Sequence, residues 1–312
     1  MDVKQLRYFL GVFDAKSITK AADQLFVAQP ALGLQVRKLE EELGVELFSR
    51  HSRGVTPTAA GNRLANRARV LLSQFERVKQ DILDFAEEPH GRVVIGMTPT
   101  TILVLAAAVA DRCRGAYPEI TLNILEGLSE RLMEWVDNGQ IDITLTYNPE
   151  AAKGLICKPL ITEELYFVER GKRRKKSDET LSFPDVIKNE LVLPSRLSLL
   201  RQIVEEAAEK TGSQPNVTFN VDSVPAIKEM VKRGLGGTIL PYGAIQEEVE
   251  AGSLRAKRIE DPELYRTLYL ASSSKRPESK AIVVVSRLIE EVASGLARSG
   301  YVGWQLVSEN AD

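Results

Sequence analysis

Histidine and cysteine are scarce in this sequence, and their scarcity limits the chemistry that the chain can perform. Its 312 residues include only 2 histidines, His51 and His90, and 2 cysteines, Cys113 and Cys157. Neither cysteine has a partner at metal-ligand spacing, so a disulfide framework is excluded and no metal site is expected. Both histidines lie in or beside the N-terminal segments, so no histidine-based catalytic triad can form in the rest of the chain.

The sequence also lacks long apolar runs and an excess of one charge. No run reaches the length of a membrane span, and the N-terminus lacks the apolar core of a signal peptide. The net charge is −2, so any basic surface for nucleic acid must be local. No P-loop and no well-placed dinucleotide-binding glycine motif occur, so we expect no cofactor and no enzyme. A cytoplasmic protein of two or three domains, without a membrane partner, is the prediction.

The stretch from Ser17 to Gly61 predicts two short helices at a sharp turn, followed by a basic loop. Ser17 is a candidate N-cap, and Gly44 is the expected end of the second helix. Helical spacing marks an inner apolar face in both helices, made by Ile18, Ala21, Ala22 and Leu25, and by Leu32, Val36, Leu39 and Leu43. Spacing alone leaves open whether this is an ordinary helical hairpin or a DNA-binding helix–turn–helix.

The outer face of the second helix suits the major groove of DNA. It presents Gln29 at its start and Arg37 and Lys38 further along. Glutamine can form two hydrogen bonds with adenine, and an apolar group can contact the thymine methyl. Beyond the helix, Arg50 and Arg53 flank an exposed turn, where a β-ribbon could follow the phosphate backbone.

The combination of residues resembles the winged helix–turn–helix of the LysR-type transcriptional regulators. The resemblance covers the N-terminal segment without gaps and includes Phe9, Ser17, Ala21-Ala22, Leu25, Gln29-Pro30-Ala31-Leu32, Leu39-Glu40, Leu43-Gly44, Leu47-Phe48, Arg50 and Thr56-Pro57-Thr58-x-x-Gly61. It is similar above all to the nitrogen-assimilation regulators of that family. One departure is Gly33-Leu34, where the family often has Ser followed by Arg or Gln.

The resemblance implies that a domain of residues 1–61 binds double-stranded DNA. The residues that we expect at the DNA are Ser17, Gln29, Pro30, Ala31, Leu32, Gly33, Leu34, Arg37, Lys38, Arg50, Arg53 and Thr56. RNA polymerase is a further candidate partner.

A long helix is predicted from Thr56-Pro57, read as an N-cap followed by a first-turn proline. Apolar residues then repeat at alternating spacings of three and four over about three heptads. The expected dimerisation residues of this linker helix, residues 56–88, are Leu64, Ala68, Leu71, Phe75, Val78 and Ile82. The alternative is that this stripe packs on its own domain. Symmetric assembly as a dimer, or by resemblance as a dimer of dimers, is favoured.

After Gly91, short apolar strands alternate with helices, which predicts βαβ units, a parallel sheet and an α/β fold. This region resembles the effector-binding domain of the same family, on the residues Tyr117-Pro118-x-Ile120, Gly139-x-Ile141-Asp142, Gly234-Leu235-Gly236 and Leu240-Pro241. The resemblance implies two Rossmann-like lobes of the periplasmic-binding-protein type within residues 91–300. Lobe I would hold residues 91–161 and 268–300, lobe II residues 162–267, and residues 301–312 would form a tail.

A ligand site is expected in the cleft between the lobes. Thr98-Pro99 predicts the start of a helix after a strand, and a helix N-terminus at this edge of a sheet is a natural anion seat. The expected effector-binding residues are Thr98, Thr100, Thr101, Thr146 and Ser195, holding a small anionic metabolite. Two alternatives stay open: a DNA-binding regulator without an effector, controlled by its abundance, and a solute-binding receptor, which the N-terminal segment disfavours.

Overall fold

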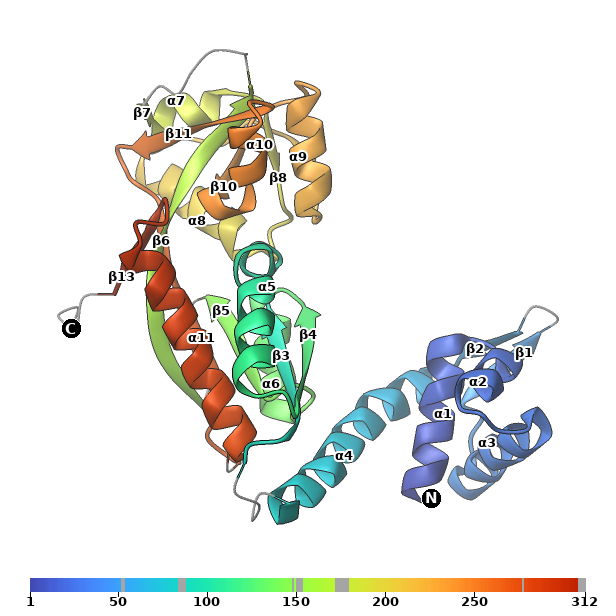
Figure 1. Cartoon of the computed structure of the whole chain (residues 1–312). Coiled ribbons are helices and arrows are strands. Elements are labelled where there is room, and N and C mark those ends of the chain that lie inside the picture. Colours follow the sequence, from blue (N-terminus) through green and yellow to red (C-terminus); the bar gives the residue numbers. More distant parts are fainter. Residues whose placement is uncertain are drawn as a thin grey trace. The chain divides into compact units, whose positions relative to one another are not determined.

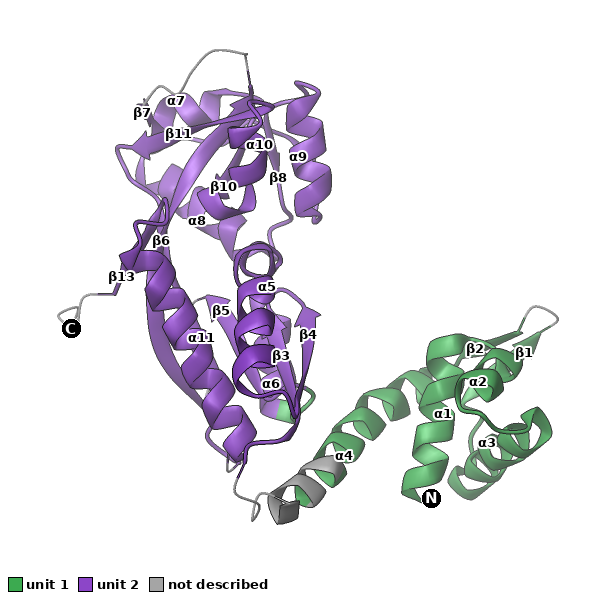
Figure 2. Ribbon diagram, in the orientation of Figure 1, with its two compact units in different colours: residues 1–85, 138–140 green, residues 86–137, 141–312 purple. Residues whose placement is uncertain are grey.

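The computed structural model describes residues 1–51, 54–83, 88–147, 149, 154–171, 180–276 and 278–307. The chain divides into two compact units (Figure 2). Unit 1 comprises residues 1–85 with 138–140, and unit 2 comprises residues 86–137 with 141–312. None of the helices in the described ranges is long and apolar enough to cross a membrane.

Unit 1 is a small helical domain with a two-stranded ribbon (Figure 1). Its elements are α1 (Val3–Ala15), α2 (Ile18–Gln24), α3 (Gln29–Leu43), β1 (Phe48–His51), β2 (Gly54–Pro57) and α4 (Ala59–Leu83). Phe9, Leu32 and Leu39 are among its fully buried core residues. The antiparallel pairing of β1 with β2 forms the expected wing.

The predicted helix ends of the helix–turn–helix are confirmed. Ser17 Oγ accepts a hydrogen bond from the backbone N–H of Lys20, which caps α2. Gly44 ends α3 with a φ of 66°, a left-handed conformation that favours glycine. Leu43 was expected on the inner face, but it is exposed because the chain turns away at Gly44.

The start of α4 differs from the prediction. Thr56 and Pro57 belong to β2, where Pro57 pairs with Phe48 at the end of the ribbon. The cap is Thr58, whose hydroxyl accepts a hydrogen bond from the backbone N–H of Gly61 at 3.0 Å. Proline is tolerated in an edge strand, and this allows the strand to run past the expected helix start.

The apolar stripe of α4 divides into two parts. Ala65 and Ala68 are fully buried, and Leu64 packs against the core of unit 1. Arg69 fastens this first part to α1 by donating from Nη2 to Asp14 Oδ1 at 2.6 Å. Packing within the chain, the alternative to a partner, therefore accounts for Leu64 and Ala68.

Further along α4, the stripe is uncovered. Leu71, Phe75 and Val78 are 47%, 52% and 63% exposed. These three residues are called the α4 apolar row below. The side chain of Ile82 lies outside the described part of the chain.

Unit 2 contains two lobes, each with its own hydrophobic cores. The first lobe is built from β3 (Gly91–Met97), α5 (Pro99–Ala116), β4 (Ile120–Glu126), α6 (Ser129–Asn138), β5 (Ile143–Tyr147) and α11 (Lys280–Arg298). Strand β3 pairs in parallel with both β4 and β5. Helices α5 and α11 pack against each other and contribute Leu105, Val109 and Val285 to the core.

The second lobe is formed by the part of the chain that follows one long strand, β6 (Leu155–Arg170), and precedes another, β12 (Tyr265–Ser273). Its elements are β7 (Thr180–Ser182), α7 (Phe183–Lys188), β8 (Leu191–Leu193), α8 (Leu199–Lys210), β9 (Val217–Asn220), α9 (Val224–Lys232), β10 (Thr238–Pro241), the 3₁₀ turn η2 (Tyr242–Ala244), α10 (Gln246–Glu250) and β11 (Leu254–Glu260). Its core residues, such as Leu165, Phe183 and Ile239, lie within residues 165–264.

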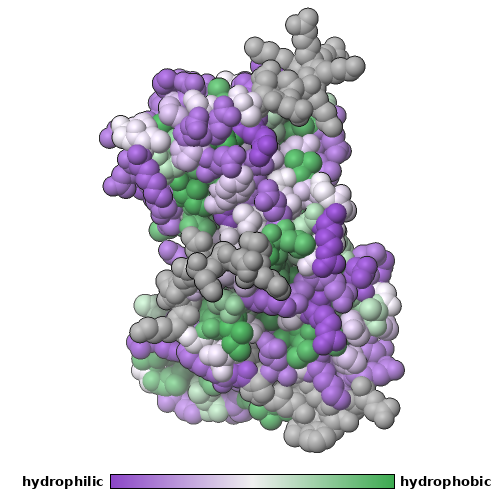
Figure 3. Space-filling model, turned by 90° about the vertical axis from the view of Figure 1, so that its left-hand side faces the viewer, coloured by the Kyte–Doolittle hydropathy of each residue, from purple (hydrophilic) through white to green (hydrophobic). Residues whose placement is uncertain are grey.

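Two long strands join the lobes, β6 (Leu155–Arg170) and β12 (Tyr265–Ser273). They pair antiparallel, as do β6 with β10 and β11, so the main sheet is mixed. The expected parallel pairing holds for β3 with β4 and β5, for β7 with β11, and for β8 with β9 in a separate two-stranded sheet. Residues 301–312 are not merely a tail, because β13 (Trp304–Leu306) pairs with β6. On the face shown in Figure 3, hydrophobic side chains form several patches in a largely hydrophilic surface.

Replacing Thr58 with alanine tests the observed cap of α4. Loss of the hydroxyl acceptor should lower the free energy of unfolding by about 1 kcal/mol. Thermal unfolding monitored by circular dichroism measures the effect, and Thr56→Ala is the matched control with an expected smaller change. A larger loss for Thr56→Ala than for Thr58→Ala would contradict this assignment.

Candidate DNA-binding face and effector pocket

One face of α3 is free of packing within unit 1. Gln29, Pro30 and Ala31 are exposed at its start, and Arg37 and Lys38 are exposed further along. Pro30 lies in the first turn, where proline leaves no backbone donor unpaired, and no side chain caps the helix. The helix therefore offers an exposed front with an amide and two cations, as the groove-reading role requires.

The turn before α3 contains a feature that the sequence did not reveal. Phe26 is 94% exposed and has a φ of 53°, a left-handed conformation that large side chains rarely adopt. The turn is closed by the backbone N–H of Val27, which donates to the carbonyl of Ala22. Phe26 thus places an uncovered aromatic ring three residues before Gln29.

The other residues of α3 expected at the DNA differ in how far they are exposed. Leu32 is wrong as a contact residue, because its side chain is 0% exposed on the inner face of α3. Leu34 is exposed, and a Cβ added at Gly33 would meet no atom within 4 Å. Packing within the chain therefore does not require a particular residue at position 33 or 34.

The wing carries the remaining candidates. Arg50 is exposed and lies 3.5 Å from Glu40, which also accepts hydrogen bonds from the backbone N–H groups of Leu47 and Phe48. Thr56 is exposed and its hydroxyl contacts His51 Nε2 at 3.0 Å. Arg53 lies outside the described residues.

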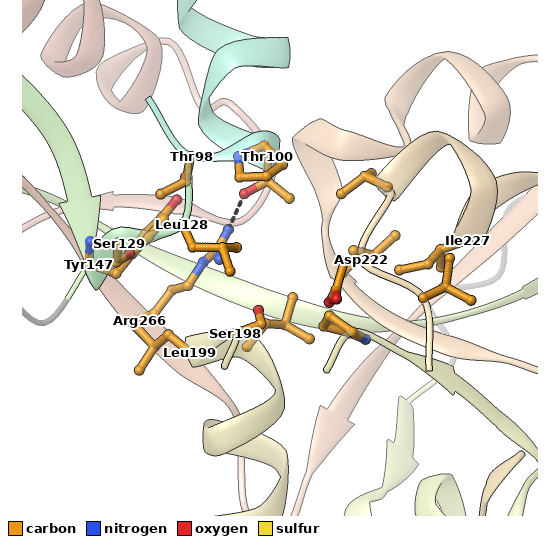
Figure 4. Close-up of a pocket in the computed structure, with 16 residues that line it drawn as sticks. Thr98, Thr100, Leu128, Ser129, Tyr147, Ser198, Leu199, Asp222, Ile227 and Arg266 are labelled. Atoms are coloured by element: carbon orange, nitrogen blue, oxygen red, sulfur yellow. Dashed lines mark hydrogen bonds between the residues drawn. The ribbon is translucent and has the colours of Figure 1, made fainter. Parts of the chain in front are cut away.

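A pocket in unit 2 lies between its two lobes. It has a volume of about 60 Å³, and its lining includes Thr98, Thr100 and Tyr147 from the first lobe and Ser198, Asp222 and Ile227 from the second. Figure 4 shows Thr98 and Thr100 at the start of α5, with Asp222 across the pocket from Tyr147. The expected location of a ligand site at the start of α5 agrees with this geometry.

The charged centre of the pocket is Arg266 on β12. Its Nη2 donates to Thr100 Oγ1 at 2.7 Å, the contact drawn as a dashed line in Figure 4. Its Nε donates to Glu163 Oε2 at 2.7 Å, and both side chains are almost fully buried. The guanidinium carbon lies 3.8 Å from the centroid of the Tyr147 ring, a cation–π contact.

Glu163 is satisfied on both oxygens. Its Oε2 accepts from the Tyr147 hydroxyl and from Arg266, and its Oε1 accepts from Trp304 Nε1 at 2.9 Å. Burial raises the pKa of Tyr147 above its ordinary value, so the phenol remains a donor. Burial alone would lower the pKa of Arg266, but the adjacent Glu163 carboxylate raises it above its ordinary value.

The five residues predicted to bind the effector fall into two groups. Thr98 and Thr100 line the pocket, while Thr101 lies just behind, bonded through its hydroxyl to the hydroxyls of Thr98 and Tyr147 at 2.7 and 3.1 Å. Thr98 holds the N-cap position of α5, but its hydroxyl contacts Thr101 instead of a backbone N–H.

Thr146 and Ser195 are not among the residues that line the pocket. The hydroxyl of each is buried and has no hydrogen-bond partner among the described residues. In β5, successive side chains point to opposite faces, so Tyr147 lines the pocket and Thr146 does not. On the other lobe, Ser195 follows Pro194 and Ser198 takes the lining position.

Glu163 and Arg266 were not predicted from the sequence. They are separated by about a hundred residues and become opposite partners in the register of β6 and β12. The one signal in the sequence is a charged residue inside an expected strand, as in Thr162-Glu163-Glu164-Leu165. Because an unpaired buried charge is costly, such a residue indicates a charged partner elsewhere in the fold.

Comparison with known proteins agrees with both units. Residues 3–62 match the profile of the "Bacterial regulatory helix-turn-helix protein, lysR family", and residues 86–294 match that of the "LysR substrate binding domain". The chain belongs to the LysR family. It is a LysR-family transcriptional regulator with a DNA-binding helix–turn–helix and an effector-binding domain, as the N-terminal motif and the two-lobed fold indicated.

Individual members of the LysR family match this chain over nearly its whole length. The nitrogen assimilation regulatory protein nac of Klebsiella aerogenes is 30% identical, covering 90% of this chain and 93% of its own. The HTH-type transcriptional regulator BbuR of Bordetella bronchiseptica is 28% identical, covering 96% and 92%. The crystal structure of the LysR-family regulator CbnR shares the fold, with a TM-score of 0.73 at 20% identity over 94% of this chain and 99% of CbnR.

Among the described residues, no group of three or more His, Cys, Asp or Glu is arranged to hold a metal ion. Cys113 is buried in the first lobe and Cys157 is partly buried on β6. Both cysteines are therefore free thiols.

Gln29→Ala tests α3 as the reader of sequence. It should cost about 1–3 kcal/mol at the cognate base and relax the preference there. Arg53→Ala should instead weaken binding to all sequences alike and reduce the salt dependence. Gel shifts on the upstream region of its own operon and on random DNA, at several salt concentrations, measure both. Equal losses on specific and random DNA for Gln29→Ala would contradict the assignment.

Proposed function

We propose that this regulator binds an interrupted DNA palindrome as a symmetric oligomer and responds to a small anionic metabolite held between the lobes of unit 2. The observation that carries the response is the pocket between the lobes, where the start of α5 and the Arg266 guanidinium meet. The pocket would bind its ligand without converting it, in keeping with relatives that are described as transcriptional regulators.

The DNA contacts follow from the exposed face of α3. Gln29 and its neighbours at the helix start would contact base edges, while Arg37, Lys38 and the wing residues would contact phosphates. One solved structure of CbnR is described as a complex with its target DNA, and it shares the fold with a TM-score of 0.72 at 21% identity over 94% of this chain and all of CbnR. The exposed residues of α3 support DNA binding through this helix in the present chain.

The oligomer is supported by the α4 apolar row. Three large apolar side chains in succession on one helix face are each about half exposed in a single chain. Their spacing of four and three is that of a coiled-coil seam, so a second copy of α4 would cover them. A two-fold symmetric protein predicts a two-fold symmetric DNA site.

The effector is supported by the surroundings of Thr100. Its hydroxyl holds the Arg266 guanidinium at the pocket wall, and the backbone N–H groups at the start of α5 lack a side-chain cap. A helix N-terminus carries partial positive charge and stabilises an anion there. A metabolite bound to both lobes would favour one lobe arrangement and so alter the hold of the oligomer on DNA.

Leu71→Lys tests the oligomer. A lysine in the middle of the α4 apolar row would bury a charge between partners, so we expect loss of the dimer and of tight operator binding. Asn66→Lys, on the opposite exposed face of α4, adds the same charge and should leave the dimer intact. Analytical ultracentrifugation decides between them, since a Leu71→Lys variant that stays dimeric at low micromolar concentration would contradict the proposed seam.

Thr100→Val tests the site of the effector, and Thr146→Val is its matched control. Both remove one buried hydroxyl, but only Thr100 lines the pocket. Calorimetry against central-metabolism acids and amino-acid precursors should show binding to wild type and to Thr146→Val, and none to Thr100→Val. Absence of binding to wild type, together with DNA bending that never responds, would instead indicate control by abundance.

A further inference from the structure

The charges around the pocket do not favour an effector that is only an anion. Arg266 is the one cation among the described lining residues, and its charge is already compensated by Glu163, with Nε and Nη2 at 2.7 and 2.6 Å from Glu163 Oε2. A ligand carboxylate beside Arg266 would therefore gain little electrostatic stabilisation, because Glu163 already balances the charge of the guanidinium. The guanidinium still presents hydrogen-bond donors to the pocket, because Glu163 and Thr100 engage only Nε and Nη2.

Asp222 supplies a negative charge on the opposite wall. Its Oδ1 accepts from the backbone N–H of Ser195 at 2.8 Å, and it forms no ion pair with any residue in the described ranges. Counting Arg266, Glu163 and Asp222 as +1, −1 and −1, these groups sum to −1. A ligand with only carboxylates would bring like charge toward Asp222, which disfavours its binding.

The two walls thus differ in the group that they accept. At the start of α5, uncapped backbone N–H groups and Arg266 donors suit a carboxylate. At Asp222, a carboxylate oxygen without a cationic partner suits an ammonium group. Figure 4 shows Thr100 and Asp222 on different sides of the pocket, so one small molecule could meet both.

The space between these walls is aliphatic. Besides Leu128 on the first lobe, the second lobe contributes Leu199, Leu200, Val221, Val224, Ile227 and Leu240 to the lining. An apolar lining of this kind favours a compact hydrocarbon side chain over a polar one.

We propose that the effector is a short aliphatic zwitterion of the α-amino-acid class, with its carboxylate at the start of α5 and its ammonium group at Asp222. This inference rests on the proposed function, because it names the class of molecule that the same pocket selects. The carboxylate end supplies the anionic group that the start of α5 is proposed to bind, although the zwitterion as a whole is neutral. The ammonium end is required by Asp222 alone and can be tested separately.

Four probes of similar size separate the two ends. Valine carries both groups, 3-methyl-2-oxobutanoate keeps the carboxylate without the amine, 2-methylpropylamine keeps the amine without the carboxylate, and succinate is a dianion. Calorimetry with the full chain should show valine binding at least about tenfold more tightly than the other three, a difference typical of one lost charge-assisted contact. Succinate or the oxo acid binding as tightly as valine would overturn the zwitterion and leave the proposed effector function standing.

Asp222→Asn tests the assignment of the ammonium site. Asparagine keeps an acceptor oxygen for the Ser195 N–H but removes the negative charge. We expect its preference for valine over the oxo acid to fall to about twofold or less, while Asp111→Asn, an exposed change on α5, retains the wild-type preference. An undiminished preference in Asp222→Asn would overturn the ammonium site. If none of the four probes binds the wild type, the zwitterion is contradicted, while the effector response itself is decided by the wider panel of central-metabolism acids and amino-acid precursors.

Discussion

The pairing of Arg266 with Glu163 constrains the architecture of unit 2. Glu163 lies in the middle of β6 and Arg266 near the start of β12, directly opposite each other in the antiparallel register of the two strands. Buried charges are stable only when they are paired and hydrogen-bonded, and removing one partner typically costs about 3–5 kcal/mol. A slip of one residue between these strands would separate the pair and move the charge on the shifted strand to the other face of the sheet. The ion pair therefore fixes the register of the two strands that join the lobes.

The same pair connects parts of the chain that are remote in sequence. Thr100 at the start of α5, Tyr147 at the end of β5 and Trp304 in β13 all donate to it or accept from it. Three elements of the first lobe are thus fastened to the crossing strands at a single position. Because this position borders the pocket, a ligand there would contact the wall of the joint between the lobes.

The helices of both units could be predicted from local patterns. The start of α5 was expected at Thr98-Pro99 and was observed there, since first-turn residues are local signals. Ser17 and Gly44 were recognisable because capping depends on neighbours a few residues away. The match of the N-terminal residues to the family pattern predicted a DNA-binding helix–turn–helix, and the comparison with known proteins agrees with it.

Several strands, the cap of α4 and part of the pocket lining could not be predicted, because they depend on contacts between residues that are distant in the sequence. Strands β11 and β13 and the first half of β6 carry polar residues that pair across the sheet, so their sequences lack a clear strand pattern. The role of Thr58 instead of Thr56 was decided by how far β2 continues along β1. Ser198 and Asp222 line the pocket through the fold of the second lobe, which no spacing along the chain could reveal.

The hydrogen bond between Trp304 and Glu163 also has a spectroscopic consequence. The chain contains 2 tryptophans, Trp135 on α6 and Trp304 in β13. The indole N–H of Trp304 is bonded directly to the carboxylate that balances Arg266. Indole fluorescence depends on nearby charge and hydrogen bonding, so a chain with phenylalanine at position 135 would carry a single built-in emitter at the joint between the lobes. Its emission would follow rearrangement of the ion pair without any attached dye.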